Sequence, residues 1–377
     1  MPLTRQQICQ SAARKLSAAL GTFGSVNALI GLDGFVDEII AVVAKRFDKD
    51  RYEAMKTITV LGEKILAAAG QSSNYELLVK QTKLGGNGPI MANALAAAGL
   101  AVTYIGNLGY PTVHPVFAEL AERAEVISIA EPGHTDALEF EDGKLMLGKH
   151  QSLGDISWEN LLQRVGKERL TSLVSGAKLI GMLNWTMLSH MSDIWGKLQS
   201  EILPHCPPRE RTFFIDLADP EKRTAKDISD ALKILARFQG SVSVILGLNL
   251  KESDQIARAL EIAAPADSEP VIEQTAKAIR QKLGISCVVI HPRKSAAAAT
   301  AEQSATFAGP FVEQPKISTG AGDHFNAGFC LGRILGLSLE ESLCAGVGTS
   351  GYYVRTAQSP TGKQLAEFIA ELPPPQG

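Results

Sequence analysis

The chain has little of what would mark several large classes of protein. Its five cysteines are scattered and odd in number, and none belongs to a Cys-x-x-Cys pair, which argues against a disulfide framework and indicates reduced thiols. No apolar run reaches bilayer-spanning length, and residues 1–20 lack the apolar core of a secretory signal. The formal net charge of −3 comes without a basic stripe. We therefore expect a cytoplasmic protein that binds neither membrane nor nucleic acid.

Short buried strands alternate with helical stretches along most of the 377 residues. This alternation predicts a doubly wound, mainly parallel α/β sheet with helices on both faces. Ligands of such sheets bind beyond the carboxyl ends of the strands. Without an internal repeat or a long linker, residues 1–377 are expected to form one domain. The strands are expected at residues 26–32, 102–106, 179–181, 212–215, 242–246 and 287–290.

A second, β-type pattern interrupts this alternation between residues 126 and 150. Apolar and polar residues alternate there on both sides of a Glu-Asp-Gly-Lys turn, which is typical of a hairpin. We expect a small β-sheet lid built from elements at about 34–47 and 126–150. Residues near 41–83 look like an insertion with an alanine-rich helix at 62–69.

The most informative segment is Ser-Thr-Gly-Ala-Gly-Asp at residues 318–323, which opens an apolar helix. Glycines let backbone N–H groups approach one spot, and a helix N-terminus attracts anions. The amides of Gly320, Ala321 and Gly322 would then hold a developing negative charge while Asp323 takes a proton from a hydroxyl. A plain helix N-cap would also explain an Asp at this position. The combination suits phosphoryl transfer to an alcohol.

A polar pair follows the strand expected at residues 242–246. Asn249 and Glu252 are three residues apart and would share a face of the first helical turn. An amide and a carboxylate there could organise a hydrated Mg²⁺ beside phosphates. A helix N-cap completed by Glu explains the same residues.

The other end of the site is expected after the first strand. Asp33 and Asp37 could accept hydrogen bonds from sugar hydroxyls, or be solvated loop acids. Gly85, Gly86 and Asn87 open the next helix and offer backbone N–H groups and an amide near the same place, although glycine-rich helix entries are common.

The run from residue 318 to residue 329 resembles the second signature of the ribokinase-like (PfkB) carbohydrate kinases. The Asn249 to Glu252 segment is similar to the Asn-x-x-Glu motif of this family, and the motifs occur in family order. The resemblance implies that Asp323 is the catalytic base and that the Gly-Ala-Gly amides form the anion hole. It also implies that Glu252 holds Mg²⁺ through water.

The chain departs from most of the family in ways that bear on the nucleotide. The segments at residues 31–37 and 85–93 are similar to the ADP-dependent sugar kinases, with Ile90 where most members have Asn. Residues 319–323 instead look like the ATP-using majority, and the His-x-Glu motif of the ADP-dependent branch is missing. The resemblance favours ATP as the donor and leaves ADP open.

The weakest match is the phosphate loop, where most members have Thr-Leu-Gly-x-x-Gly. Here the last strand runs into His291, Pro292, Arg293 and Lys294, so two cations replace the glycines. Arg293 and Lys294 could bind phosphate, or be a solvated basic turn. Thr319 is expected beside the phosphates and Gly348 beside the adenine, although Gly348 equally suits close helix packing.

We therefore interpret the chain as a sugar kinase that moves the terminal phosphoryl group of a nucleotide to a hydroxymethyl group of a sugar or polyol. Two alternatives stay open: a nucleoside kinase, and a non-catalytic sugar or nucleotide sensor. The loss of the phosphate-loop glycines motivates the sensor. The resemblance also implies a homodimer that forms through the lid.

Overall fold

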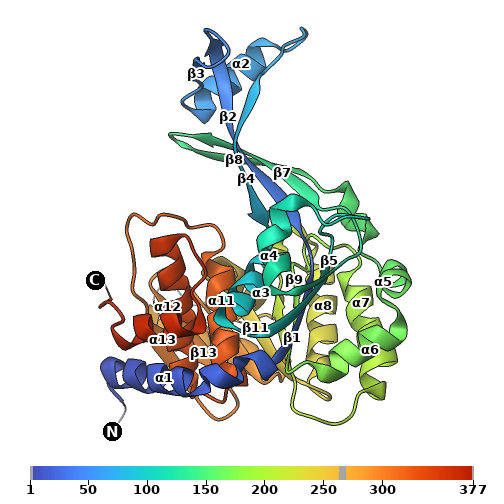
Figure 1. Cartoon of the computed structure of the whole chain (residues 1–377), viewed down its shortest axis with the longest axis vertical. Coiled ribbons are helices and arrows are strands. Elements are labelled where there is room, and N and C mark those ends of the chain that lie inside the picture. Colours follow the sequence, from blue (N-terminus) through green and yellow to red (C-terminus); the bar gives the residue numbers. More distant parts are fainter. Residues whose placement is uncertain (1–2, 263–268, 376–377) are drawn as a thin grey trace.

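The computed structural model describes residues 3–262 and 269–375 and contains a nine-stranded sheet with the predicted parallel core (Figure 1). Neighbouring strands are parallel from β12 to β6, whereas β13 and β14 add an antiparallel edge. In sheet order the strands are β14 (Ser304–Ala308), β13 (Ser295–Ala299), β12 (Cys287–Ile290), β11 (Ser243–Leu248), β10 (Thr212–Asp216), β9 (Leu179–Leu183), β1 (Asn27–Leu32), β5 (Ala101–Gly106) and β6 (Glu125–Ser128). The predicted fold class is confirmed.

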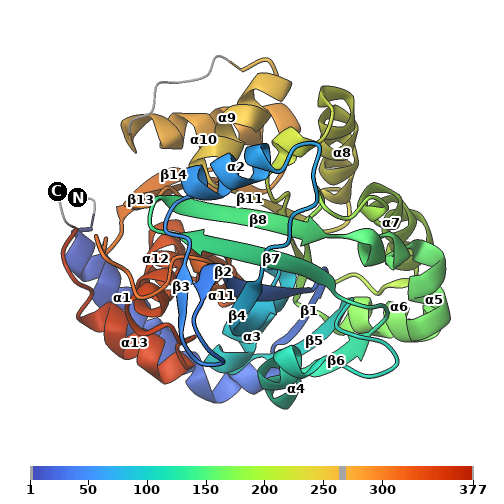
Figure 2. The same cartoon turned by 90° about the horizontal axis from the view of Figure 1, so that it is seen from above.

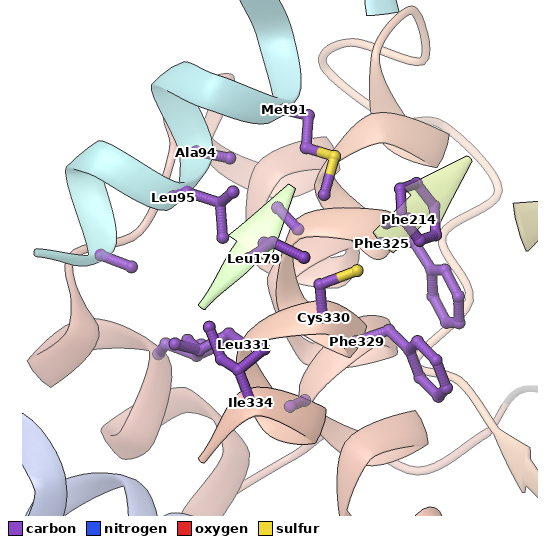
Figure 3. Close-up of a cluster of buried hydrophobic side chains, with 14 of the residues drawn as sticks. Met91, Ala94, Leu95, Leu179, Phe214, Phe325, Phe329, Cys330, Leu331 and Ile334 are labelled. Carbon is purple, nitrogen blue, oxygen red and sulfur yellow. The ribbon is translucent and has the colours of Figure 1, made fainter. Parts of the chain in front are cut away.

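Helices cover both faces of this sheet, so its strands are buried on both sides. Alternate residues of each strand point to opposite faces and enter two separate cores. Figure 3 shows part of the first core, where Met91 and Phe325 lie among its apolar side chains. The helices on that face are α1 (Arg5–Ala19), α3 (Asn87–Ala98), α4 (Ala118–Arg123), α11 (Ala321–Ile334), α12 (Leu339–Thr356) and α13 (Gly362–Ala370). The other face carries α5 (Trp158–Val165), α6 (Lys167–Gly176), α7 (Met191–Lys197), α8 (Ala225–Phe238), α9 (Leu250–Ala259) and α10 (Glu269–Leu283).

The strand β13 was not expected from the sequence. Its run of four alanines, at residues 296–299, favours a helix by intrinsic propensity. All four are fully buried, and they alternate between the two cores. The small side chains allow α10 and α12 to pack closely on opposite faces of the strand, so burial overrides the local preference.

A second, smaller sheet stands above one end of the main sheet in Figure 1, and its strands β7 and β8 lie across the middle of the molecule in Figure 2. Its strands are β2 (Phe35–Arg46), β3 (Tyr52–Ala54), β4 (Leu77–Gly85), β7 (Gly133–Phe140) and β8 (Gly143–Lys149). Helix α2 (Ile58–Ala67) packs against the sheet through Leu61, which forms a small apolar cluster with Met55, Ile40, Val42 and Leu138. Most of the stretch that looked like an insertion therefore belongs to this sheet, because β4 pairs with β2 from Phe35 to Val42.

Among the helices described here, none is both long and apolar enough to span a membrane.

Candidate active site

About half of the residues singled out in the sequence line a cavity of about 420 Å³ at the carboxyl edge of the main sheet. This is where a doubly wound sheet binds its ligands, because the loops after parallel strands meet at one edge. Most of the polar lining comes from the end of β10, the segments that follow β11 and β12, and the first turn of α11. The polar side chains of the cavity are Asn87, Asp216, Asn249, Glu252, His291, Arg293, Lys294, Ser295, Ser318, Asp323 and Ser350.

Helix α11 begins at a tight turn that only glycine suits. Gly320 is the N-cap residue and has a left-handed backbone with φ of 87°. A β-carbon there would also come within 3.3 Å of the Ile90 side chain. The turn sets the next acid, Asp323, in the first helical turn with its side chain facing the cavity.

Asp323 is buried and accepts a hydrogen bond from Asn87 Nδ2 at 2.9 Å. Burial raises the pKa of its carboxyl to about 8, and the Asn87 hydrogen bond opposes this while the negative charges of Asp33 and Glu252 add to it. The carboxyl therefore exchanges its proton near neutral pH, which suits a general base.

The three amides expected in the anion hole do not behave alike. The Ala321 N–H donates to Ser318 O at 3.2 Å and so closes the turn. Within the described residues, the N–H groups of Gly320 and Gly322 make no backbone hydrogen bond. They remain available at the positive end of the α11 dipole, together with the first-turn N–H of Asp323.

Asp33 lies beneath the site and is completely buried. Its carboxylate accepts the N–H groups of Asn87 at 3.0 Å and Gly88 at 2.9 Å, and the side-chain amide of Asn184 at 2.8 Å. Burial nevertheless raises the pKa of Asp33. Asp33 thus caps α3 and fixes Asn87, whose amide in turn contacts Asp323. Its direct contact with a sugar stays a prediction.

The glycines before α3 allow two carboxylates to approach the backbone. A β-carbon on Gly86, where φ is 101°, would lie 2.8 Å from Asp33 Oδ2, and one on Gly85 would overlap the carboxylate of Asp37. Asp37 is 9% exposed at the base of the small sheet, and burial raises its pKa although Thr135 donates to it. These residues come together as the sequence predicts.

Asn249 and Glu252 form the capping box that was the alternative interpretation of their spacing. Glu252 N donates to Asn249 Oδ1 and Asn249 N donates to Glu252 Oε2, both at 2.9 Å. The second carboxylate oxygen, Oε1, accepts Asp219 N at 2.9 Å. Both residues still line the cavity, so the cap fixes their side chains at its wall. A metal role for Glu252 stays a prediction.

A buried acid that the sequence analysis did not single out faces Glu252 across the cavity wall. Asp216 is the last residue of β10 and accepts a hydrogen bond from Asn326 Nδ2 at 2.9 Å. Burial and the nearby charges of Glu252 and Asp323 raise its pKa well above the usual range. Its signal in the sequence was its place directly after a buried strand.

The phosphate-loop cations line the cavity mouth. Arg293 and Lys294 make no ion pair within the described residues, and Lys294 Nζ lies 5.1 Å from the centre of the Phe311 ring. Two neighbouring residues, His291 and Ser295, were not predicted from the sequence as site residues. His291 Nε2 and Ser295 Oγ are buried in the cavity wall without a partner in the described chain, and burial lowers the pKa of His291 to about 4.

Two predicted nucleotide contacts lie elsewhere. A β-carbon on Gly348 would meet Ile369 Cγ1 at 2.6 Å, so this glycine lets α12 pack on α13. Its neighbours Val347 and Gly351 line the cavity instead, because they lie on the opposite side of α12. Thr319 is not among the cavity-lining residues, and its backbone carbonyl accepts the hydroxyl of Tyr353 on α12 at 3.0 Å.

Comparison with known proteins identifies relatives over nearly the whole chain. The family described as prokaryotic ketohexokinase matches residues 4–372. A ketohexokinase of Haloferax volcanii is 31% identical over 346 residues, which cover 91% of each chain. A ribokinase of Arabidopsis thaliana, solved with ribose and ATP, superposes with a TM-score of 0.63 at 17% identity, covering 92% of this chain and 99% of its own. An adenosine kinase of Sinorhizobium meliloti gives 0.60 at 17% identity, with 92% and 99% covered.

Proposed function

This chain belongs to the prokaryotic ketohexokinase family of ribokinase-like carbohydrate kinases, and on that premise we propose that it transfers the terminal phosphoryl group of ATP to a hydroxymethyl group of a ketohexose. The observation that carries the proposal is the placement of Asp323, buried at the head of α11 and held by Asn87 at the cavity wall. A base in that position serves an alcohol acceptor. The 31% identical relative supports a ketohexose as that acceptor.

The chemistry follows from the residues around Asp323. One carboxylate oxygen takes the hydroxyl proton while the sugar oxygen bonds to the terminal phosphorus. The bond from that phosphorus to the bridging oxygen breaks, and ADP leaves. The free N–H groups of Gly320 and Gly322 and the α11 dipole would stabilise the charge on the transferring group. Such catalysis rests mainly on positioning and electrostatics.

The raised pKa of Asp323 gives a pH prediction. A general base works in its deprotonated form, so kcat/KM for the sugar should rise tenfold per pH unit below about pH 8 and level off above it. Asn87→Ala removes the hydrogen bond that favours the charged carboxylate, so the pKa of Asp323 should rise. The pH at which kcat/KM levels off should therefore be higher in this variant. Initial rates between pH 5.5 and 9.5 measure both profiles. A flat profile in the intact enzyme would contradict the assignment.

The oxygen-rich wall of the cavity fits a hydrated Mg²⁺. Carboxylates and amides are the ligand types this ion prefers, and it usually keeps several waters. The buried Asn326 Oδ1 has no partner in the described chain, beside the mutually repelling acids Asp216 and Glu252. We propose that Glu252 holds the ion through water and that Asp216 contributes charge. The bound ion would offset negative charge on the donor phosphates.

The donor phosphates are proposed to lie under the turn after β12. Arg293 and Lys294 would supply charge, and the unpartnered polar atoms of His291 and Ser295 would replace contacts that the missing glycines provide elsewhere. A dry, buried polar atom without a partner is costly, so a bound phosphate oxygen is a physical reason for both.

Removing the two cations should weaken the donor site selectively. Because charge-assisted hydrogen bonds contribute roughly 1.5–3 kcal/mol, Arg293→Ala combined with Lys294→Ala should raise the KM for ATP at least about tenfold. The KM for the sugar should not change. Lys363→Ala, on the exposed side of α13, is the matched control. An unchanged KM for ATP in the double variant would indicate a solvated basic turn.

We propose that the small sheet covers the acceptor and pairs with its copy in a homodimer. Most of the large hydrophobic side chains exposed on the described chain belong to this sheet and its connections: Phe47, Val60, Ile65, Leu66, Leu77, Val79, Met146 and Leu147. Such a concentration is typical of an interaction surface.

An acceptor panel tests the proposed function. Ketohexoses, ribose, polyols and adenosine are offered with ATP or ADP, and nucleotide turnover is followed. We expect the highest kcat/KM for a ketohexose with ATP. Preference for adenosine would make the chain a nucleoside kinase. Binding without turnover over the whole panel would support a sensor, although a pure binder has no need of a buried base at Asp323.

A further inference from the structure

The residue after the proposed base is a histidine whose side chain is tied into the catalytic turn. The His324 ring is buried and makes two polar contacts, through Nδ1 to Gly320 O at 2.8 Å and through Nε2 to Ser359 Oγ at 2.9 Å. By position alone, His324 is an ordinary residue of the first turn of α11. The structure instead links it directly to the N-cap glycine of α11.

A tyrosine from the neighbouring helix α12 completes the arrangement. The Tyr353 ring stacks on His324 with centroids 3.6 Å apart and an angle of 12° between the planes. Its hydroxyl donates to Thr319 O at 3.0 Å. Two adjacent carbonyls of the turn, those of Thr319 and Gly320, are therefore each held by a side chain from outside the turn.

The contacts define the tautomer of His324. A carbonyl oxygen only accepts, so Nδ1 must carry the proton that goes to Gly320 O. Burial lowers the pKa of His324 to about 4, so the ring is neutral near pH 7 and Nε2 is an acceptor. Ser359 must then donate its hydroxyl proton to Nε2. The resulting chain runs from Ser359 through the imidazole to the carbonyl of Gly320.

Fixing these carbonyls fixes the amides that follow them. A peptide unit is planar and trans, so the N–H of one residue points opposite to the carbonyl of the residue before it. The Tyr353 contact therefore sets the direction of the Gly320 N–H. The His324 contact sets that of the Ala321 N–H, which closes the turn onto Ser318 O at 3.2 Å. Together they hold Gly320 in its left-handed conformation, where a β-carbon would lie 3.2 Å from the Ile90 side chain and 3.4 Å from the Tyr353 hydroxyl.

We propose that His324, Tyr353 and Ser359 are positioning residues that hold the anion-hole turn in its catalytic conformation. The inference rests on the proposed function, because it assigns them a part in transition-state stabilisation by that turn. The free amides at the head of α11 then face the transferring phosphoryl group without reorganising during the reaction. None of these three side chains lines the cavity.

Single substitutions separate this role from general packing. His324→Ala removes the side-chain contact to Gly320 O and leaves the backbone N–H of residue 324, which donates to the same oxygen at 3.1 Å. Tyr353→Phe removes only the hydroxyl that holds Thr319. Because small displacements of catalytic groups can cost about 10²-fold, we expect kcat to fall about 10- to 100-fold in both variants. The KM values, and the Kd values for sugar and ATP measured by calorimetry, should stay at wild-type values. Tyr352→Phe is the matched control, because that ring packs on Phe368 instead.

Conservative replacements test the atomic assignment. Asn at position 324 can place its amide N–H near Nδ1, whereas Gln places it near Nε2. His324→Asn should therefore recover part of the lost kcat, and His324→Gln should not. Equal activity of the two variants would contradict the assigned tautomer.

The outcomes separate this inference from the proposed function. Wild-type kcat in well-folded His324→Ala and Tyr353→Phe variants, with turnover still lost in Asp323→Asn, would overturn the positioning role alone. A lower melting temperature with unchanged kcat of the folded protein would also overturn it, since packing alone predicts that result. Retained turnover in Asp323→Asn would instead refute the base role of Asp323, and absence of turnover in the intact enzyme would refute the proposed function.

Discussion

Replacing Asp323 by Asn is expected to lower kcat by ~10²- to 10⁴-fold, the range that a general base contributes. An amide has nearly the same shape as the carboxyl but cannot take the hydroxyl proton. Its carbonyl oxygen can still accept the Asn87 Nδ2 hydrogen bond, which measures 2.9 Å in the structure. The buried site should therefore stay intact. Stopped initial-rate assays measure kcat, and calorimetry measures the retained binding of sugar and ATP.

The matched control is Asp193→Asn, which changes an exposed acid in the first turn of α7. It carries the same substitution at the same kind of helix position but lies outside the cavity lining. We expect wild-type kcat there. Near-normal turnover in a folded Asp323→Asn variant would show that this acid acts only as part of the helix start.

Glu252→Gln is expected to lower activity about 10- to 100-fold at fixed Mg²⁺, the usual cost of disturbing residues that orient a metal site. The carboxylate carries a charge and accepts two backbone N–H groups, from Asn249 and Asp219. An amide loses the charge and keeps only one acceptor atom. High Mg²⁺ should restore part of the loss, and titration of the rate against Mg²⁺ concentration measures it.

Glu221→Gln is the control for this second prediction, because Glu221 is an exposed partner of Lys251 on the neighbouring loop. The capping box alone predicts a different result for Glu252→Gln. Losing a cap costs about 1 kcal/mol of stability without altering Mg²⁺ dependence. A lower melting temperature with an unchanged Mg²⁺ titration would therefore assign Glu252 to the cap only.

The sequence predicted the features that depend on local pattern. The strands β1, β9, β10, β11 and β12 follow from buried apolar runs. The Gly-Ala-Gly-Asp segment predicted a helix N-terminus, and the structure places it at the edge of the sheet where such folds bind their ligands.

What the sequence could not supply was the tertiary partner of each group. Nothing local shows that Asp33 is covered by three amide donors, or that Gly348 faces Ile369. The strand β4 exposes most of its side chains, so its weak alternation did not reveal a strand. The ring that stacks on His324, that of Tyr353, lies on another helix, so no local pattern shows this contact.

The most direct test of the account is the product of one reaction. Purified protein is incubated with a ketohexose, Mg²⁺ and ATP labelled in the terminal phosphoryl group, beside the Asp323→Asn variant, and phosphorus NMR locates the label. The account predicts a phosphate ester on a hydroxymethyl carbon of the sugar, formed by the intact enzyme and strongly reduced in the variant. Labelled inorganic phosphate without ester, or equal ester from both proteins, would contradict it.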